Sequence, residues 1–197
     1  MKKLLFRRDS SEIEKLRDLI EKQKHRTLVA WVIDCSEAIL AIFESRHGDD
    51  PRPRQAIQAA RSWAVGDIKM PAAQQAALAS HRAATEALDD LAACAAARAM
   101  GHVVGTVHVE THALGFVIYG LTAIARNNDS LIAEKIADEC RRLYDRLIYW
   151  EREIETDQRP WAPFLLREDQ PNKEKLLHDK ESSKVGQIGK KNATIAR

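Results

Sequence analysis

Residues 100–115 read Met-Gly-His-Val-Val-Gly-Thr-Val-His-Val-Glu-Thr-His-Ala-Leu-Gly, and they hold three of the seven histidines in the most apolar part of the chain. An α-helix turns by about 100° per residue. On one continuous helix, an arc of roughly 80° would therefore hold Gly101, Gly105, His108, His112, Gly115 and Tyr119. This stripe has almost no bulk, so a neighbouring helix can approach it closely, with imidazoles and a phenol at the contact. A stripe made only for packing would more simply be Leu and Ala.

The glycines of this stretch also bear on whether one helix runs through it. Gly101 and Gly105 each lower helix propensity by about 1 kcal/mol relative to alanine. We therefore predict two helices, the first beginning at Asp89-Asp90 and the second ending at about Arg126, with a junction near Thr106.

The remainder of the sequence also favours helices. Alanine is abundant, β-branched and aromatic residues are sparse, and glycine and proline stand mainly between periodic segments. The fold class we predict is all-α, a compact multi-helix bundle of about six to seven helices with a polar C-terminal tail. The other predicted helices run over about 11–24, 27–45, 51–65, 71–88 and 130–155.

The chain divides into three parts by composition. Residues 1–24 predict a charged N-terminal helix, and residues 25–166 form the helical domain. Residues 167–197 are polar, rich in lysine and short of aromatics, so we expect a mobile tail.

Charge and cysteine content exclude some classes of function. The net charge of +2 and the pI near 8.4 are too mild for a nucleic-acid footprint. No apolar run reaches the length of a membrane span. The three cysteines lie far apart, as expected for buried thiols in a reducing compartment, so we expect a cytoplasmic protein. Phosphate-binding glycine loops, nucleophile elbows and Cys-x-x-Cys pairs are absent from the sequence.

Three groups of motifs resemble a known family. They are His25-Arg26-Thr27-Leu28-Val29-Ala30-Trp31 with Asp34-Cys35, then Asp49–Ile57 with Ala59–Ala64, then Gly101-His102, His108 and His112-Ala113-Leu114-Gly115. In order and spacing they resemble the immunity-five-like group of immunity proteins attached to bacterial polymorphic toxin systems. The resemblance spans about 24–125 and extends more loosely to 166. It implies an all-helical fold and a cognate protein toxin as partner.

His108 and His112 are the candidate metal ligands. At a spacing of four residues on a helix, both imidazoles can reach one metal ion. A third ligand would come from elsewhere, with Asp34 the first candidate and His102 and His81 the others. We favour instead hydrogen bonds across a helix interface, with a contact to a small ligand or partner as the further alternative.

Four residues are candidates for contact with a partner: Arg52, Arg54, His102 and Trp161. Cations in the first turn of a helix oppose its dipole, so Arg52 and Arg54 need either nearby acids such as Asp49, Asp50 or Asp34, or an acidic partner. We favour pairing within the chain. Trp161 lies beside two prolines near the tail, and we expect it to be the most exposed tryptophan.

Two hypotheses of function follow. The first is a non-enzymatic immunity protein that neutralises a cognate toxin by direct binding, without a cofactor, nucleic acid or membrane. The alternative is a metal-binding helical protein that uses a divalent metal on His108 and His112, as a hydrolase would.

Overall fold

The computed structural model describes residues 4–128, 130, 132–167 and 171–180. The regular elements of this part are all helical, which confirms the predicted all-α fold. They are η1 (Ser11–Ile13), α1 (Glu14–Ile20), α2 (His25–Glu44), α3 (Arg52–Ala64), α4 (Met70–Glu86), α5 (Leu91–His108), α6 (Thr111–Arg126), α7 (Ile132–Glu153) and η2 (Pro163–Leu166). Residues 173–180 are also helical. None of the described helices is long and apolar enough to cross a membrane.

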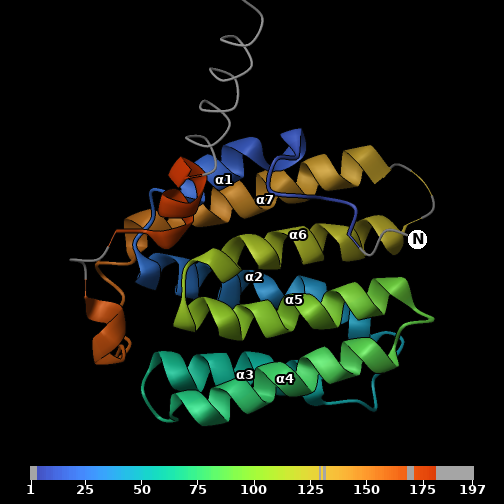
Figure 1. Ribbon diagram of the computed structural model, residues 1–197, viewed down its shortest axis with the longest axis horizontal. Helices are drawn as coiled ribbons and strands as arrows, with labels where there is room; N and C mark the ends of the chain where they lie inside the picture. Colours follow the sequence, from blue (N-terminus) through green and yellow to red (C-terminus); the bar gives the residue numbers. More distant parts are fainter. Residues whose placement is uncertain (1–3, 129, 131, 168–170, 181–197) are drawn as a thin grey trace, which may run out of the picture.

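The helices stack in layers around α5 (Figure 1). Helices α3 and α4 lie on one side, α1 and α7 on the other, and α2, α5 and α6 lie between them. Helix α5 packs against α2, α3, α4 and α6. Its alanines and glycines explain this position, because small side chains let neighbours approach from every direction, and 13 of its 18 residues are buried.

Helix α5 begins directly after Asp89-Asp90, where the sequence predicts its start. The side chain of Asp90 accepts a hydrogen bond from the backbone N–H of Ala93 at 3.0 Å. This cap satisfies one of the free amides of the first turn.

The predicted break within residues 100–115 exists, but it lies at Val109 and Glu110 rather than near Thr106. Helix α5 continues through Gly105, whose carbonyl accepts a hydrogen bond from Val109 N at 2.9 Å. Val109 then adopts an extended conformation, with φ −156° and ψ 139°. β-Branched residues such as valine favour this extended conformation. The glycines instead remain helical, and their packing role is described below.

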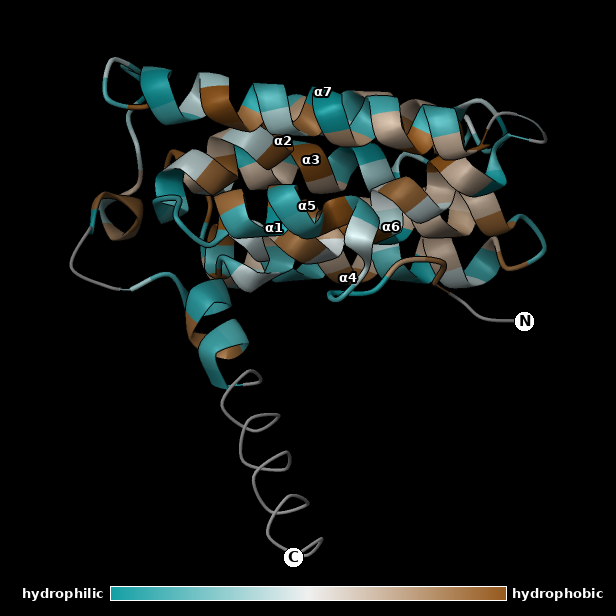
Figure 2. Ribbon diagram, turned by 90° about the horizontal axis from the view of Figure 1, so that it is seen from above, coloured by the Kyte–Doolittle hydropathy of each residue, from teal (hydrophilic) through white to brown (hydrophobic). Residues whose placement is uncertain are grey.

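Helix α7 covers the core with one apolar face. Figure 2 shows brown bands among teal ones along this helix, and its buried residues are Ile136, Leu143 and Leu147. Trp31 of α2 is fully buried and donates from Nε1 to the carbonyl of Leu143 at 3.0 Å. This contact fixes α7 against α2.

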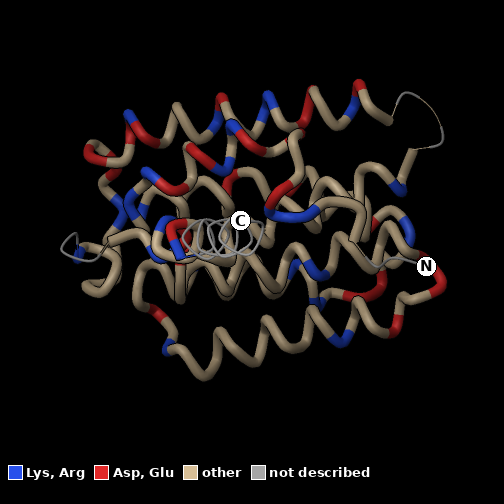
Figure 3. The backbone as a smooth tube through the Cα atoms, turned by 45° about the horizontal axis from the view of Figure 1, so that its top comes forward, with Lys and Arg blue, Asp and Glu red and all other residues tan. Residues whose placement is uncertain are grey.

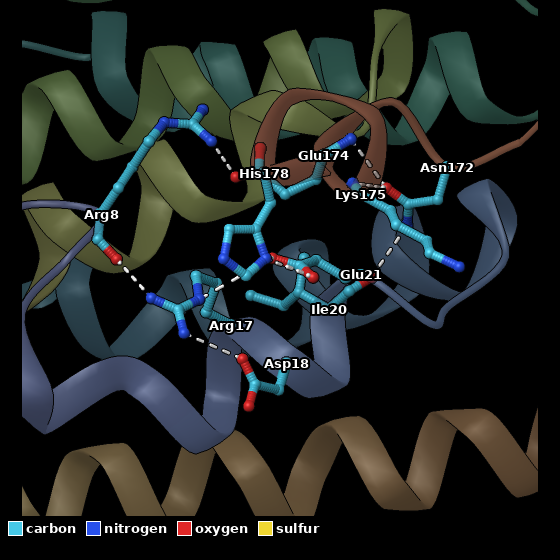
Figure 4. A network of polar contacts seen from close by, with 9 residues as sticks. All are labelled: Arg8, Arg17, Asp18, Ile20, Glu21, Asn172, Glu174, Lys175 and His178. Carbon is cyan, nitrogen blue, oxygen red and sulfur yellow. Dashed lines mark hydrogen bonds and ion pairs between the residues drawn. The ribbon is translucent and has the colours of Figure 1, made fainter. Parts of the chain in front are cut away.

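Residues 171–180 dock against α1 (Figure 4). The side chain of Asn172 donates from Nδ2 to the carbonyls of Ile20 at 2.9 Å and Gln23 at 3.0 Å, and its Oδ1 accepts from Glu174 N at 2.9 Å. Glu174 is 1% exposed and pairs with Arg8. The described part of the predicted tail is thus attached to the bundle, whereas residues 168–170 and 181–197 lie outside the described residues.

Candidate functional site

Three glycines of α5 and α6 leave room for the imidazole rings of histidines on neighbouring helices. A β-carbon at Gly115 would lie 2.5 Å from Cε1 of His102, and one at Gly105 would lie 2.6 Å from Cγ of His112. At Gly101 it would lie 2.7 Å from Nε2 of His81. Real side chains do not approach so closely, so each glycine leaves the space that one ring fills. The predicted close approach of helices is therefore real, but the rings come from α4, α5 and α6 rather than from one stripe.

The rings of His81, His102, His112 and Tyr119 form the histidine cluster. The Nδ1 atoms of His102 and His112 lie 3.0 Å apart, so one donates a hydrogen bond and the other accepts it. Tyr119 stacks on His102, with ring centroids 5.1 Å apart. His81 meets His102 edge-on at 6.0 Å. Of His108 and His112, for which the sequence favoured hydrogen bonds across a helix interface, His112 makes one, to His102.

Burial keeps this cluster neutral. Burial, together with the smaller effects of the neighbouring His112, His81 and Arg98, lowers the pKa of His102 to about 3. Burial also lowers the pKa of His81 and of His112. Neutral imidazoles can share a proton in a hydrogen bond, whereas two imidazolium rings would have no acceptor and would repel each other.

The structure does not bring His108, His112 and Asp34 together. His108 is the last residue of α5 and stacks on Trp63, with centroids 6.2 Å apart and planes 16° apart. His112 faces His102 instead, because the helix break separates the two histidines. Asp34 accepts hydrogen bonds from Arg146 at 2.8 Å and Trp150 at 2.9 Å on α7. Within the described ranges, no group of three or more His, Cys, Asp or Glu side chains could hold a metal ion.

Arg52 and Arg54 are paired within the chain. Arg52 binds Asp50, one of the expected acids, and also Glu86. Arg54 binds Glu44 at 2.7 Å and Glu37 at 3.3 Å. The hydrogen bonds from these guanidinium groups lower the pKa of Asp50 and of Glu44.

Trp161 is buried, with 7% of its surface exposed, so the expectation that it is the most exposed tryptophan is wrong. The segment folds back onto α3, because Ala162 N donates to the carbonyl of Ala64 at 2.8 Å. The guanidinium of Arg159 covers the Trp161 ring at 4.7 Å. Trp150 is only partly buried.

A cleft of about 710 Å³ opens beside the junction of α5 and α6. Its walls are the start of α2, η2 and residues 171–175, and its lining includes His25, His108 and Glu110. His25 hydrogen-bonds through Nε2 to the carbonyl of Thr106 at 2.6 Å, and its Nδ1 lies 3.9 Å from Oε1 of Glu110. Burial lowers the pKa of His25, although the nearby Glu110 carboxylate opposes this effect.

Cations surround this cleft, which is hereafter called the basic cleft. Five of them line it: Lys22, Lys24, Arg167, Lys173 and Lys175. They come from segments that are far apart in sequence, so the sequence showed the charges but not their convergence. The lysines after residue 172 read as a solvated tail because they alternate with acids, and one of those acids, Glu174, is in fact turned inward to Arg8.

Comparison with known proteins identifies the family. A family model described as "Imm-5 like putative immunity protein" matches residues 18–149, which is about two thirds of the chain. No curated protein and no solved structure matches this chain significantly. The matched range contains the histidine cluster and the inner wall of the basic cleft, which is formed by the lining residues between 21 and 110. The outer wall of the cleft is formed by η2, Arg167 and residues 171–175, and it lies beyond the matched range. The chain belongs to the Imm-5-like family of immunity proteins.

Proposed function

We propose that this chain is a cytoplasmic, non-enzymatic immunity protein that neutralises a cognate toxin by binding it directly. The observation that carries the proposal is the family match over residues 18–149. An immunity protein implies a toxin as its partner, and steric occlusion of that toxin needs no chemistry of the inhibitor's own.

The geometry supports a binding role. The histidines of the cluster have lowered pKa values and pack against glycines, and His102 and His112 are hydrogen-bonded to each other. Arg52 and Arg54 are bound to acids of the same chain. Groups that could have served chemistry therefore stabilise a rigid scaffold, and a rigid scaffold lowers the entropy lost on binding.

Co-expression tests the proposal. Cells that express the toxin encoded next to the gene for this chain should stop growing, and co-expression of the chain should restore growth. The matched control is co-expression of an unrelated helical protein at the same level, which should not protect. Equal growth of toxin-expressing cells with and without this chain would contradict the proposal.

A further inference from the structure

The basic cleft gathers five cations from distant segments of the chain on one concave surface. Many arginines elsewhere are bound to acids of the same chain, as Arg54 is to Glu44 and Arg146 is to Asp34. Lys24, on the cleft, is likewise paired with Glu155. Lys22, Arg167, Lys173 and Lys175 are exposed and have no ion pair within the part of the chain that the structure describes. Figure 3 shows how the blue and red positions are otherwise interspersed, particularly along α7.

Among the described residues, two carboxylates line the cleft, and neither forms an ion pair with these cations. Glu21 already pairs with His178 at 2.9 Å and lies 3.7 Å from Arg17 (Figure 4). Glu110 is 4% exposed and lies beside His25, so a partner in the cleft does not meet it. The exposed charge of the described lining residues is therefore positive, and a concave surface of one sign concentrates its field.

The cleft also offers an apolar contact. Phe164 of η2 lines it, is 37% exposed and packs against Trp63, with ring centroids 5.8 Å apart. An aromatic ring held by a buried neighbour and surrounded by charges is the arrangement of an interface anchor with a polar rim.

We propose that the basic cleft receives an acidic segment of the toxin. Carboxylates of that segment contact Lys22, Arg167, Lys173 and Lys175, and an apolar side chain rests on Phe164. The inner wall lies in the family-matched range and the outer wall lies beyond residue 149, so the outer wall adds contacts particular to this chain. This inference rests on the proposed function.

The Asn172 side chain positions the outer wall. It joins the end of α1 to the first turn of residues 173–180 through hydrogen bonds at both of its ends. Lys173 and Lys175 are thereby held over the cleft in the free protein. An interface formed in advance binds with a smaller loss of entropy than a segment that orders on binding.

The test is the affinity of the purified full chain for an inactivated form of the toxin encoded beside it, measured by biolayer interferometry. The variant Lys173→Glu/Lys175→Glu reverses two cations of the cleft. The matched control, Arg82→Glu/Lys135→Glu, reverses two exposed cations on α4 and α7 that do not line the cleft. We expect at least about tenfold weaker binding for the cleft variant, mainly through slower association, and little change for the control. Raising the salt concentration should weaken wild-type binding more than binding of the cleft variant.

Other outcomes separate the two proposals. If wild type and both variants bind the toxin equally, the cleft is not the interface, although the proposed function stands. If wild type does not bind at all, the proposed function fails and the inference fails with it. A 20-nucleotide single strand of DNA serves as a second probe. If it binds wild type and not the cleft variant while toxin binding is unchanged, the cleft takes phosphates and the inference is overturned.

Discussion

Replacing Gly115 by alanine tests whether this glycine makes room for the ring of His102. Gly115 lies inside α6, where the new β-carbon would come within 2.5 Å of Cε1 and 3.0 Å of Cγ of His102. The ring has little freedom to move away, because Nδ1 is hydrogen-bonded to His112 and one face stacks on Tyr119. The added methyl group therefore has to displace the ring or the helix.

Two opposing effects set the magnitude. Overpacking in a tight interior costs about 1–3 kcal/mol. Replacing glycine by alanine within a helix stabilises the helix by up to about 1 kcal/mol, because alanine has the higher helix propensity. The net effect is a loss of up to about 2 kcal/mol in the free energy of unfolding, and for a chain of this size it lowers Tm by up to roughly 8 °C.

Gly120→Ala is the matched control, because Gly120 lies on the same helix and its β-carbon would meet Ile39 at an ordinary 3.4 Å. We expect this variant to be neutral or more stable than wild type. Urea unfolding followed by circular dichroism measures both. In a His102→Ala background, Gly115→Ala should stop being destabilising, since the ring is gone. If Gly115→Ala stabilises the wild-type chain as much as Gly120→Ala does, the role of Gly115 in making room for the ring is refuted.

Three further predictions concern other contacts. The pKa of His102 is about 3 in the folded chain and near 6.5 when unfolded, so stability should fall as pH drops below 6.5, by about 1.4 kcal/mol per pH unit for this histidine; urea unfolding between pH 7 and 5 measures this, and His102→Asn should make the profile less steep. Asn172→Ala should speed hydrogen exchange at residues 171–180 while the other helices keep their protection; unchanged exchange there would contradict its role as a clamp. Asp34→Ala should cost about 1 kcal/mol, and Arg146→Ala should add little to it in a double-mutant cycle, whereas fully additive costs would show that the pair does not interact.

Local signals were sufficient for most of the helices, but not for residues 173–180, which lie in the predicted tail. The cap at Asp90 and the paired helices around residues 100–126 follow from short-range rules of capping and propensity. The junction was misplaced because glycine propensity suggested a break at Gly105 and Thr106. That glycine stays helical because it accommodates His112, a contact with a residue beyond the break.

The candidate site was less predictable, because its contacts join distant parts of the chain. Asp34 pairs with Arg146, 112 positions away, rather than with Arg52 or Arg54, for which the sequence made it a candidate acid. The histidine cluster includes His81 of α4, which no spacing rule connects to α5 and α6. Trp161 stands beside two prolines, a setting that suggested exposure, yet the chain folds back so that the ring is buried.

The basic cleft shows the same limit. Lys22, Arg167 and Lys173 are unremarkable in sequence, and their convergence depends on the docking of residues 171–180 through Asn172. Composition suggested only a solvated tail. A buried Glu174 that pairs with Arg8 is the contact that composition could not reveal.

Titration of the purified toxin's activity with this chain tests the central claim most directly. Neutralisation by direct binding predicts that inhibition is complete at one chain per toxin molecule and that both proteins are recovered intact from the complex. Full toxin activity in the presence of excess folded chain would contradict the account. Inactivation of many toxin molecules by one chain would also contradict it, because such turnover belongs to an enzyme.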